Sequence, residues 1–315
     1  MGKATREAFG EALVELVDRF PGLVVLDSDL SKSTMTADFA KKHPQRHFEF
    51  GIAESNMIAA AAGMALMGKV PVCTSFACFL IGRLETIRVA VTLNRANVKL
   101  VGTHAGLGIG DDGASQMGLE DLAAMRALPG MTVLQPGDAL EAKQAVEWML
   151  QHDGPVYLRL TRQKLDDVHK PDYKFACGKL DAVWEPEPKA KHFQATVIAS
   201  GGTVGGAVAA AKDLQPKGFA VRVVNAGTIA PFDADGLADF ARDSQRLVTV
   251  EDHNVAGGLG GAVCEAAAAL GLGKPVVRLA VRETGESGLP AELYEKHGLS
   301  APHIVDACIK NLEQP

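Results

Sequence analysis

Short apolar runs alternate with longer stretches of helical periodicity along most of this chain. The run Leu23–Asp27 is typical, with four apolar residues followed by an aspartate. Such runs indicate parallel strands buried on both faces, and the helical stretches between them would cover those faces. The alternation therefore predicts an α/β fold with mostly parallel, doubly wound sheets.

The alternation stops once, in a stretch rich in Asp, Lys, Pro and Glu that ends near residue 191. We predict strands at 23–27, 47–51, 69–76, 98–104, 131–135 and 156–162, then at 195–200, 220–224, 246–251 and 276–281. Helices are predicted at 4–20, 56–68, 139–152, 204–214 and 302–312. A further helix is predicted to follow the glycine-rich turn at 257–261 and to end at residue 270. We expect two α/β domains, 1–165 and 192–315, joined by a linker at 166–191.

Charge and composition argue against several classes of partner. A net charge of -6 and a pI near 5.9 disfavour nucleic acid and anionic membranes as ligands. The longest apolar stretch, 57–67, is too short to cross a bilayer, and the N-terminus lacks the apolar core of a signal peptide. We expect a cytoplasmic protein whose five scattered cysteines are reduced: Cys73, Cys78, Cys177, Cys264 and Cys308.

Glu54 lies in the segment Gly51–Met57, between a predicted strand and a strongly apolar helix. One interpretation is a solvated glutamate in the first turn of a helix, where the helix dipole favours negative charge. The other is a carboxyl group held against an apolar wall, where it exchanges a proton or hydrogen bond with a heteroaromatic ligand.

Two further features follow predicted strands. Phe76 and Phe79 come at the end of a strand, the edge where open α/β sheets bind ligands, although core packing would also explain the pair. A loop with glycines at 106, 108, 110 and 113 surrounds Asp111 and Asp112. It matches no nucleotide-binding motif, so it is either a flexible turn or a backbone that a substrate approaches closely.

Three basic residues, Arg6, His104 and Arg162, are predicted at the ends of elements. Each alone is explained by solvation. Together they would form an anion pocket, because a guanidinium matches the oxygens of a phosphate.

With these residues in view, the chain resembles the pyrimidine-binding and C-terminal domains of transketolases. The resemblance runs from about Thr5 into the C-terminal tail, and its most specific stretch is the loop GTHAGLGIGDDGASQMGLEDL at 102–122. It implies a thiamine-diphosphate-dependent enzyme that moves a two-carbon ketol unit from a ketose phosphate to an aldose.

The resemblance assigns roles near the cofactor. Glu54 matches the glutamate that hydrogen-bonds N1′ of the aminopyrimidine and so activates the cofactor. Phe76 and Phe79 match the aromatic pocket around that ring, and Asp29 matches an aspartate near the cofactor at the subunit interface. Gly82 stands where some relatives have a third aromatic residue.

On the substrate side, the resemblance assigns a phosphate-binding set and a hydroxyl-recognising pair. Asp112 matches the aspartate that recognises the C2 hydroxyl of the sugar. Gln116 stands where relatives have histidine or glutamine. Glu54 and His104 are our catalytic candidates. The phosphate-binding set is Arg6, Ser33, His104 and Arg162.

One family motif is absent. Transketolases bind the diphosphate and its metal through a Gly-Asp-Gly motif, which occurs nowhere in these 315 residues. We therefore expect a split enzyme, active only with a separate N-terminal subunit that carries the ligands of Mg²⁺ or Ca²⁺. An α2β2 assembly with contacts between copies of this chain is the expected form.

Two alternatives remain open. The β subunit of a 2-oxo acid dehydrogenase shares the architecture and the glutamate, but oxo acids need no phosphate pocket. A catalytically silent regulatory subunit is the other possibility, and retention of both Glu54 and Asp112 argues against it. The ketose could belong to the pentose phosphate pathway, another catabolic route or a sulfosugar pathway.

Overall fold

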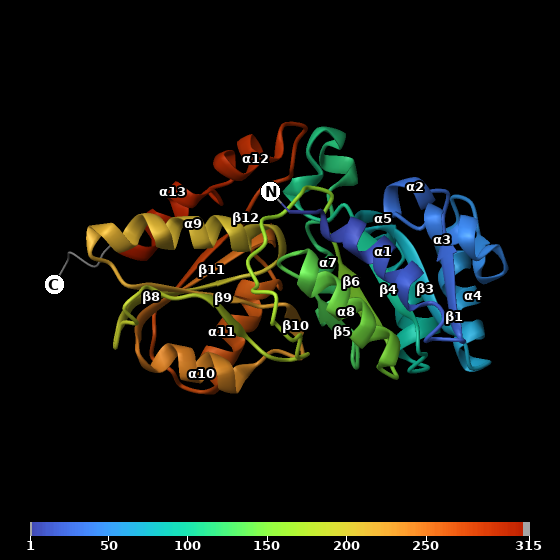
Figure 1. Cartoon of the computed structure of the whole chain (residues 1–315), viewed down its shortest axis with the longest axis horizontal. Coiled ribbons are helices and arrows are strands. Elements are labelled where there is room, and N and C mark those ends of the chain that lie inside the picture. Colours follow the sequence, from blue (N-terminus) through green and yellow to red (C-terminus); the bar gives the residue numbers. More distant parts are fainter. Residues whose placement is uncertain (1, 311–315) are drawn as a thin grey trace.

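The computed structural model describes residues 2–310 and contains two sheets lying side by side (Figure 1). Neighbouring strands of the seven-stranded sheet pair in parallel, except that β10 pairs antiparallel with β5. In spatial order its strands are β10 (Thr228–Ala230), β5 (Thr132–Leu134), β6 (Val156–Arg159), β4 (Lys99–Thr103), β3 (Val70–Phe76), β1 (Leu23–Asp27) and β2 (His47–Glu49).

Helices cover both faces of this sheet because successive strand residues point to opposite sides. Leu23 and Val25 pack in the cluster that includes α1 (Thr5–Leu16) and α8 (Ala139–Gln151). Val24 and Leu26 pack instead in the cluster that includes α4 (Glu54–Leu66). The remaining elements of this half are α2 (Ser31–Thr34), α3 (Ala37–Lys42), α5 (Ala77–Ile81), α6 (Leu84–Thr86), the π-helical turn η2 (Ile87–Thr92), α7 (Asp121–Arg126), and the 3-10 turns η1 (Pro44–Arg46), η3 (Leu107–Asp112) and η4 (Ala114–Gln116).

The second sheet has five strands, of which β7 is antiparallel to its neighbour. In spatial order they are β12 (Val276–Val281), β11 (Ser244–Asn254), β8 (Phe193–Ala199), β9 (Val221–Asn225) and β7 (Asp181–Trp184). Its helices are α9 (Val204–Leu214), α10 (Ala234–Arg242), α11 (Leu259–Ala269), α12 (Pro290–Lys296) and α13 (Ala301–Ile309), with 3-10 turns η5 (Gly201–Thr203) and η6 (Gln215–Lys217). The predicted class, an α/β fold with two doubly wound and mostly parallel sheets, is confirmed.

The structure differs from the sequence-based expectation at several places. The segment 166–191, expected to be a linker, contains β7, and β10 from the second half of the chain completes the first sheet. Both are short strands at the edge of a sheet. They are held by backbone hydrogen bonds to a neighbouring strand, and their sequences carry too short a hydrophobic pattern to predict a strand. Helix α4 begins at Glu54, two residues before the predicted start. Of the predicted C-terminal helix, residues 311 and 312 lie outside the described residues.

Arg159, at the end of β6, forms ion pairs with a carboxylate of each domain. Its guanidinium is 1% exposed and contacts Asp121 Oδ2 of the first domain at 2.9 Å and Asp252 Oδ1 of the second at 2.8 Å. Two carboxylates within hydrogen-bonding distance compensate the cost of burying this charge.

Candidate functional site

Except for Arg6, in the first turn of α1, the residues singled out from the sequence follow the carboxyl ends of parallel strands in the first sheet. Helices that return antiparallel to the strands begin at the same edge, which is why Glu54 starts α4 there. The positions are Asp29 and Ser33 after β1, Glu54 after β2, Phe76 and Phe79 after β3, His104, Asp112 and Gln116 after β4, and Arg162 after β6.

Glu54 is buried, with 3% exposure, at the first position of α4. The open N–H groups of the first helical turn favour a carboxylate there. Within residues 2–310 its charged neighbour is the half-exposed Arg83, whose Nη2 lies 3.6 Å from Glu54 Oε2. The carboxyl group is thus withdrawn from water yet makes no short hydrogen bond to another described side chain, which leaves it available to a ligand.

Phe76 and Phe79 form a stacked pair, with ring centroids 5.4 Å apart and an interplanar angle of 7°. Phe76 is the last residue of β3 and Phe79 belongs to α5, so the pair spans the turn between strand and helix. The imidazole of His104 also stacks on Phe76, at 3.8 Å between centroids. An aromatic surface of this kind suits a flat heteroaromatic ring.

His104 is held by hydrogen bonds at both ring nitrogens. Arg6 Nη1 lies 2.8 Å from His104 Nε2, and because guanidinium can only donate, Nε2 is the acceptor. Nδ1 therefore carries the proton and donates to Thr103 Oγ1 at 2.9 Å. Burial, together with the positive charges of Arg6 and Arg162, lowers the pKa of His104 to about 3, so the ring is neutral.

The basic cluster predicted from the sequence is assembled in the fold. Arg6 Nη1 also donates to the backbone oxygen of Ser33 at 2.8 Å. Burial and the nearby Arg162 both lower the pKa of Arg6. Two guanidinium groups that repel one another, beside a neutral imidazole, form a site that an anion would stabilise.

The loop after β4 carries Asp112 and Gln116. Asp112 ends η3 and faces Arg162, whose Nη1 lies 3.4 Å from Asp112 Oδ1. Gln116 ends the next turn, η4, and is partly exposed. The structure therefore brings Asp112 to the arginine cluster and leaves Gln116 on the neighbouring turn.

Asp29 lies at the rim, exposed, with a left-handed φ of 61°. Its backbone N–H donates to Glu49 Oε1 at 2.8 Å. The turn rests on Asp27, a buried carboxylate that accepts from the hydroxyls of Thr34, Thr36 and Thr74. This network places both Asp29 and Ser33 at the edge of the sheet.

Comparison with known families identifies both halves of the chain. Residues 1–167 match the model described as "Transketolase, pyrimidine binding domain", and residues 187–304 match "Transketolase, C-terminal domain". The chain belongs to the transketolase family.

Individual relatives agree with this membership. A "Putative transketolase C-terminal section" of Methanocaldococcus jannaschii is 39% identical, with 99% of this chain and 97% of the relative covered. The "6-deoxy-6-sulfo-D-fructose transketolase subunit SqwH" of Clostridium sp. (strain MSTE9) is 36% identical, with 96% and 92% covered. Transketolase of Rattus norvegicus is 39% identical over 96% of this chain, which spans 48% of that relative's length.

A solved structure described as "Split gene transketolase, inactive beta4 tetramer" superposes with a TM-score of 0.88 at 42% identity, covering 99% of both chains. Both domains of this chain therefore have a well-matched experimental counterpart. Thiamine diphosphate is the cofactor of the family. The stacked phenylalanines suit its aminopyrimidine ring, as does the Glu54 carboxyl, which makes no short hydrogen bond to a described side chain. A Cβ added at Gly82, where some relatives have a third aromatic residue, would make ordinary van der Waals contact with Phe79 O at 3.4 Å.

Neither a metal site nor a membrane span is present in the part of the chain that the structure describes. No group of three or more His, Cys, Asp or Glu residues there has the geometry to hold a metal ion. None of the helices within residues 2–310 combines the length and apolarity needed to cross a bilayer.

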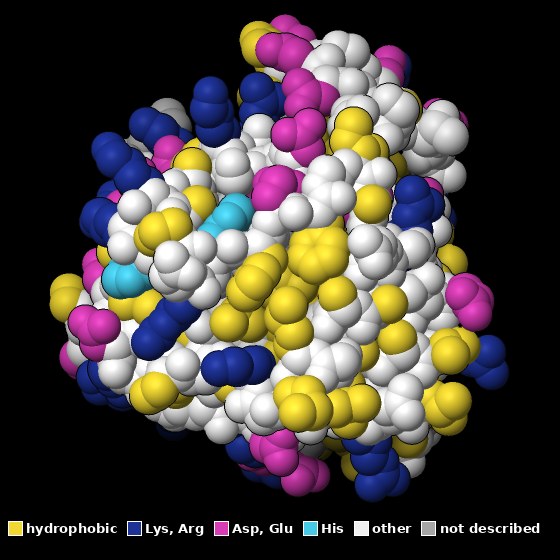
Figure 2. Space-filling model, turned by 90° about the vertical axis from the view of Figure 1, so that its right-hand side faces the viewer, with side chains coloured by type: hydrophobic (Ala, Val, Ile, Leu, Met, Phe, Trp, Pro, Cys, Tyr) yellow, Lys and Arg dark blue, Asp and Glu magenta, His cyan; other side chains and the backbone are white. Residues whose placement is uncertain are grey.

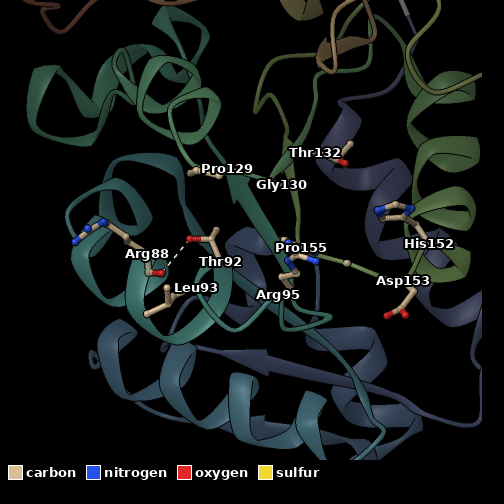
Figure 3. Close-up of a pocket in the computed structure, with 11 residues that line it drawn as sticks. Arg88, Thr92, Leu93, Arg95, Pro129, Gly130, Thr132, His152, Asp153 and Pro155 are labelled. Carbon is tan, nitrogen blue, oxygen red and sulfur yellow. Dashed lines mark hydrogen bonds between the residues drawn. The ribbon is translucent and has the colours of Figure 1, made fainter.

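A cavity of about 760 Å³ lies away from these residues, at the opposite edge of the first sheet (Figure 3). It is lined by Thr132 at the start of β5 and by Pro155 just before β6, with the amino ends of the strands around it. In the figure the guanidinium of Arg88 points away from the other lining residues. Because it lies at the amino ends of the strands, the cavity is separate from the candidate site.

One face of the first domain exposes several large apolar side chains (Figure 2). Ile52 and Met67, at the two ends of α4, are each 84% exposed, and Leu66 is 68% exposed. Leu93, just after η2, adds 76% exposure, and α4 and η2 are in contact. Several large apolar side chains exposed along one helix and its neighbour are typical of an interaction site. We call these four residues the α4 patch.

Sequence reasoning missed three features of the site. Arg83 was overlooked because it lies between α5 and α6, far from Glu54 in the chain, and no local pattern indicates their contact. Thr103, the hydrogen-bond partner of His104, precedes it directly and could have been considered. The partner of the Asp112 loop in the second domain, Ser287, is 175 residues from Asp112 in the chain, and no local pattern indicates it.

Proposed function

We propose that this chain is the C-terminal subunit of a split, thiamine-diphosphate-dependent transketolase that moves a two-carbon ketol unit from a ketose phosphate to an aldose. The observation that carries the proposal is the clustering of Glu54, the phenylalanine pair and the Arg6–His104–Arg162 group at one sheet edge. Enzymes assemble groups of this kind where a cofactor and substrate meet.

When bound, thiamine diphosphate would supply a carbon nucleophile able to carry the two-carbon unit from donor to acceptor. Glu54 would bind N1′ of its aminopyrimidine and share a proton with that nitrogen, because the carboxyl is shielded from water and lacks a competing donor. Phe76 and Phe79 would hold the ring in place.

On the substrate side, Arg6 and Arg162 would bind the terminal phosphate, with the Ser33 turn beside them. The neutral His104 would present Nε2 to the substrate as a hydrogen-bond acceptor when Arg6 turns to the phosphate. Asp112 would accept a hydrogen bond from the C2 hydroxyl, with Gln116 at the next position and Asp29 nearer the cofactor. A sulfonate is also a tetrahedral anion, and a relative is named for a sulfosugar.

The partner would carry the diphosphate-binding domain and the ligands of Mg²⁺ or Ca²⁺. Support comes from relatives of this length described as a C-terminal section and as a subunit, and from the inactive β4 assembly of a split-gene relative. The α4 patch begins at Ile52, two residues from Glu54, so a subunit seated there would complete the cofactor site. We propose an α2β2 assembly.

In the deciding experiment, this chain is mixed with a candidate partner that carries the Gly-Asp-Gly motif. Thiamine diphosphate and Mg²⁺ are added to the mixture. We expect no ketol transfer from the chain alone and transfer from the mixture. Glu54→Ala should abolish transfer at ordinary cofactor concentrations, whereas Glu85→Ala, an exposed glutamate on α6, should not. Full activity of the isolated chain would refute the split-enzyme proposal, and normal turnover by Glu54→Ala would refute the role of Glu54.

A further inference from the structure

The loop that carries Asp112 is built into the core of the C-terminal domain. Leu107 and Ile109 from η3, together with Met117 and Leu119, pack in the same buried cluster as Val197 of β8 and other residues of the second sheet. Figure 1 shows this segment beside α12. A loop from the first sheet therefore has its apolar anchor in the second domain.

Polar and steric contacts act at the tip of the same loop. Ser287, in the turn before α12, donates from Oγ to the backbone oxygen of Asp111 at 2.7 Å. Gly110 has a φ of 78°, and a Cβ added there would lie 3.2 Å from Pro290 Cδ. The backbone on both sides of Asp111 is thus confined by the C-terminal domain.

The same loop also reaches the arginine cluster. Arg162 Nη1 donates to Ile109 O at 2.5 Å and lies 3.4 Å from Asp112 Oδ1. A shift of the loop would therefore move both the carboxylate of Asp112 and the guanidinium that faces it.

We infer that the C-terminal domain positions the sugar-recognising loop, and that Ser287 is the positioning residue for Asp112. This rests on the proposed function, in which Asp112 recognises the C2 hydroxyl of the sugar. Ser287 itself touches no substrate. It fixes the peptide that precedes Asp112, and a misplaced carboxylate loses the geometry that a hydrogen bond requires.

The test compares two acceptor aldose phosphates, one with a C2 hydroxyl and one 2-deoxy, in the assembled two-subunit enzyme. We expect Ser287→Ala to raise KM for the hydroxylated acceptor about three- to tenfold, as for a lost hydrogen bond, with little change in kcat. KM for the 2-deoxy acceptor should be unchanged. Ser287→Thr keeps the hydroxyl and should restore the wild-type KM.

The control is Ser300→Ala, which removes a hydroxyl that bonds Glu295 and His303 in the same domain. It should leave both KM values unchanged. Equal KM values for wild type and Ser287→Ala on both acceptors would overturn the inference, as would an equal rise on both. A wild-type complex without any ketol transfer would refute the proposed function instead.

Discussion

Arg6 Nη1 donates a hydrogen bond of 2.8 Å to Nε2 of His104. The two residues are 98 positions apart, one in the first turn of α1 and the other after β4. This contact sets the tautomer of the imidazole and opposes its protonation, because a second positive charge beside Arg6 is unfavourable.

The neutral state of His104 predicts a pH effect on stability. Its pKa is lowered to about 3, whereas an unfolded histidine titrates near 6.5. Between these values the unfolded chain binds a proton that the folded chain does not, so stability falls as pH drops from about 6.5 towards 3. The free energy of unfolding, measured by urea titration at several pH values, should fall less steeply with decreasing pH in His104→Asn than in wild type. The two slopes should differ by at most about 1.4 kcal/mol per pH unit. An unchanged slope would contradict the assignment.

Arg6→Ala should weaken binding of phosphorylated sugars more than binding of an unphosphorylated ketol donor. The lost contact is a charge-assisted hydrogen bond, so KM for the sugar phosphate should rise by about tenfold or more. Steady-state kinetics of the two-subunit enzyme with both donors is the measurement. Arg19→Ala, which breaks a surface ion pair with Glu147, is the control and should change neither KM. Equal losses on both donors would argue against a phosphate site.

Arg159→Met should strongly destabilise the chain. Removing the guanidinium leaves Asp121 and Asp252 buried without their cation, a change that typically costs about 3–5 kcal/mol. Urea unfolding followed by circular dichroism would measure the loss. Arg242→Met, at an exposed pair with Asp239, should shift the unfolding free energy by less than about 0.5 kcal/mol. Similar values for the two variants would show that the buried triad adds nothing to stability.

A charge in the α4 patch should prevent subunit association. Met67→Glu places a carboxylate at a position that is 84% exposed, so folding should be unaffected while an apolar interface would have to bury the charge. Sedimentation velocity with and without the partner should show smaller species than wild type. Leu270→Glu, on the C-terminal domain and 44% exposed, is the matched control. Wild-type assembly by Met67→Glu would exclude the patch as an interface.

Local pattern was enough to predict most strands of both sheets. Leu23–Asp27, a central strand, was predicted at the bounds the structure gives because buried parallel strands are short apolar runs. The edge strand Val276–Val281 was also predicted at its observed bounds, since five of its six residues are apolar. The edge strands β7 and β10 were missed, since they depend on backbone pairing with distant partners. The start of α4 was predicted two residues late, so the prediction left Glu54 before the helix, whereas it is the first helical residue.

The candidate site also has a part that the sequence predicts and a part that only the structure shows. That Phe76, His104 and Arg162 gather at one edge follows from the order of strands and helices, because carboxyl ends of parallel strands meet there. The hydrogen bond between Arg6 and His104, and the neutral imidazole it implies, required distances between side chains.

By itself, the sequence determined the α/β class, the family resemblance and the residues at the sheet edge, since these depend on local periodicity and on motifs that are contiguous in the chain. Only the tertiary structure decided that Arg159 joins the two domains and that Ser287 holds the loop of Asp112. The physical reason is that both depend on contacts between groups more than 90 residues apart, whose geometry is set by how the two domains pack together.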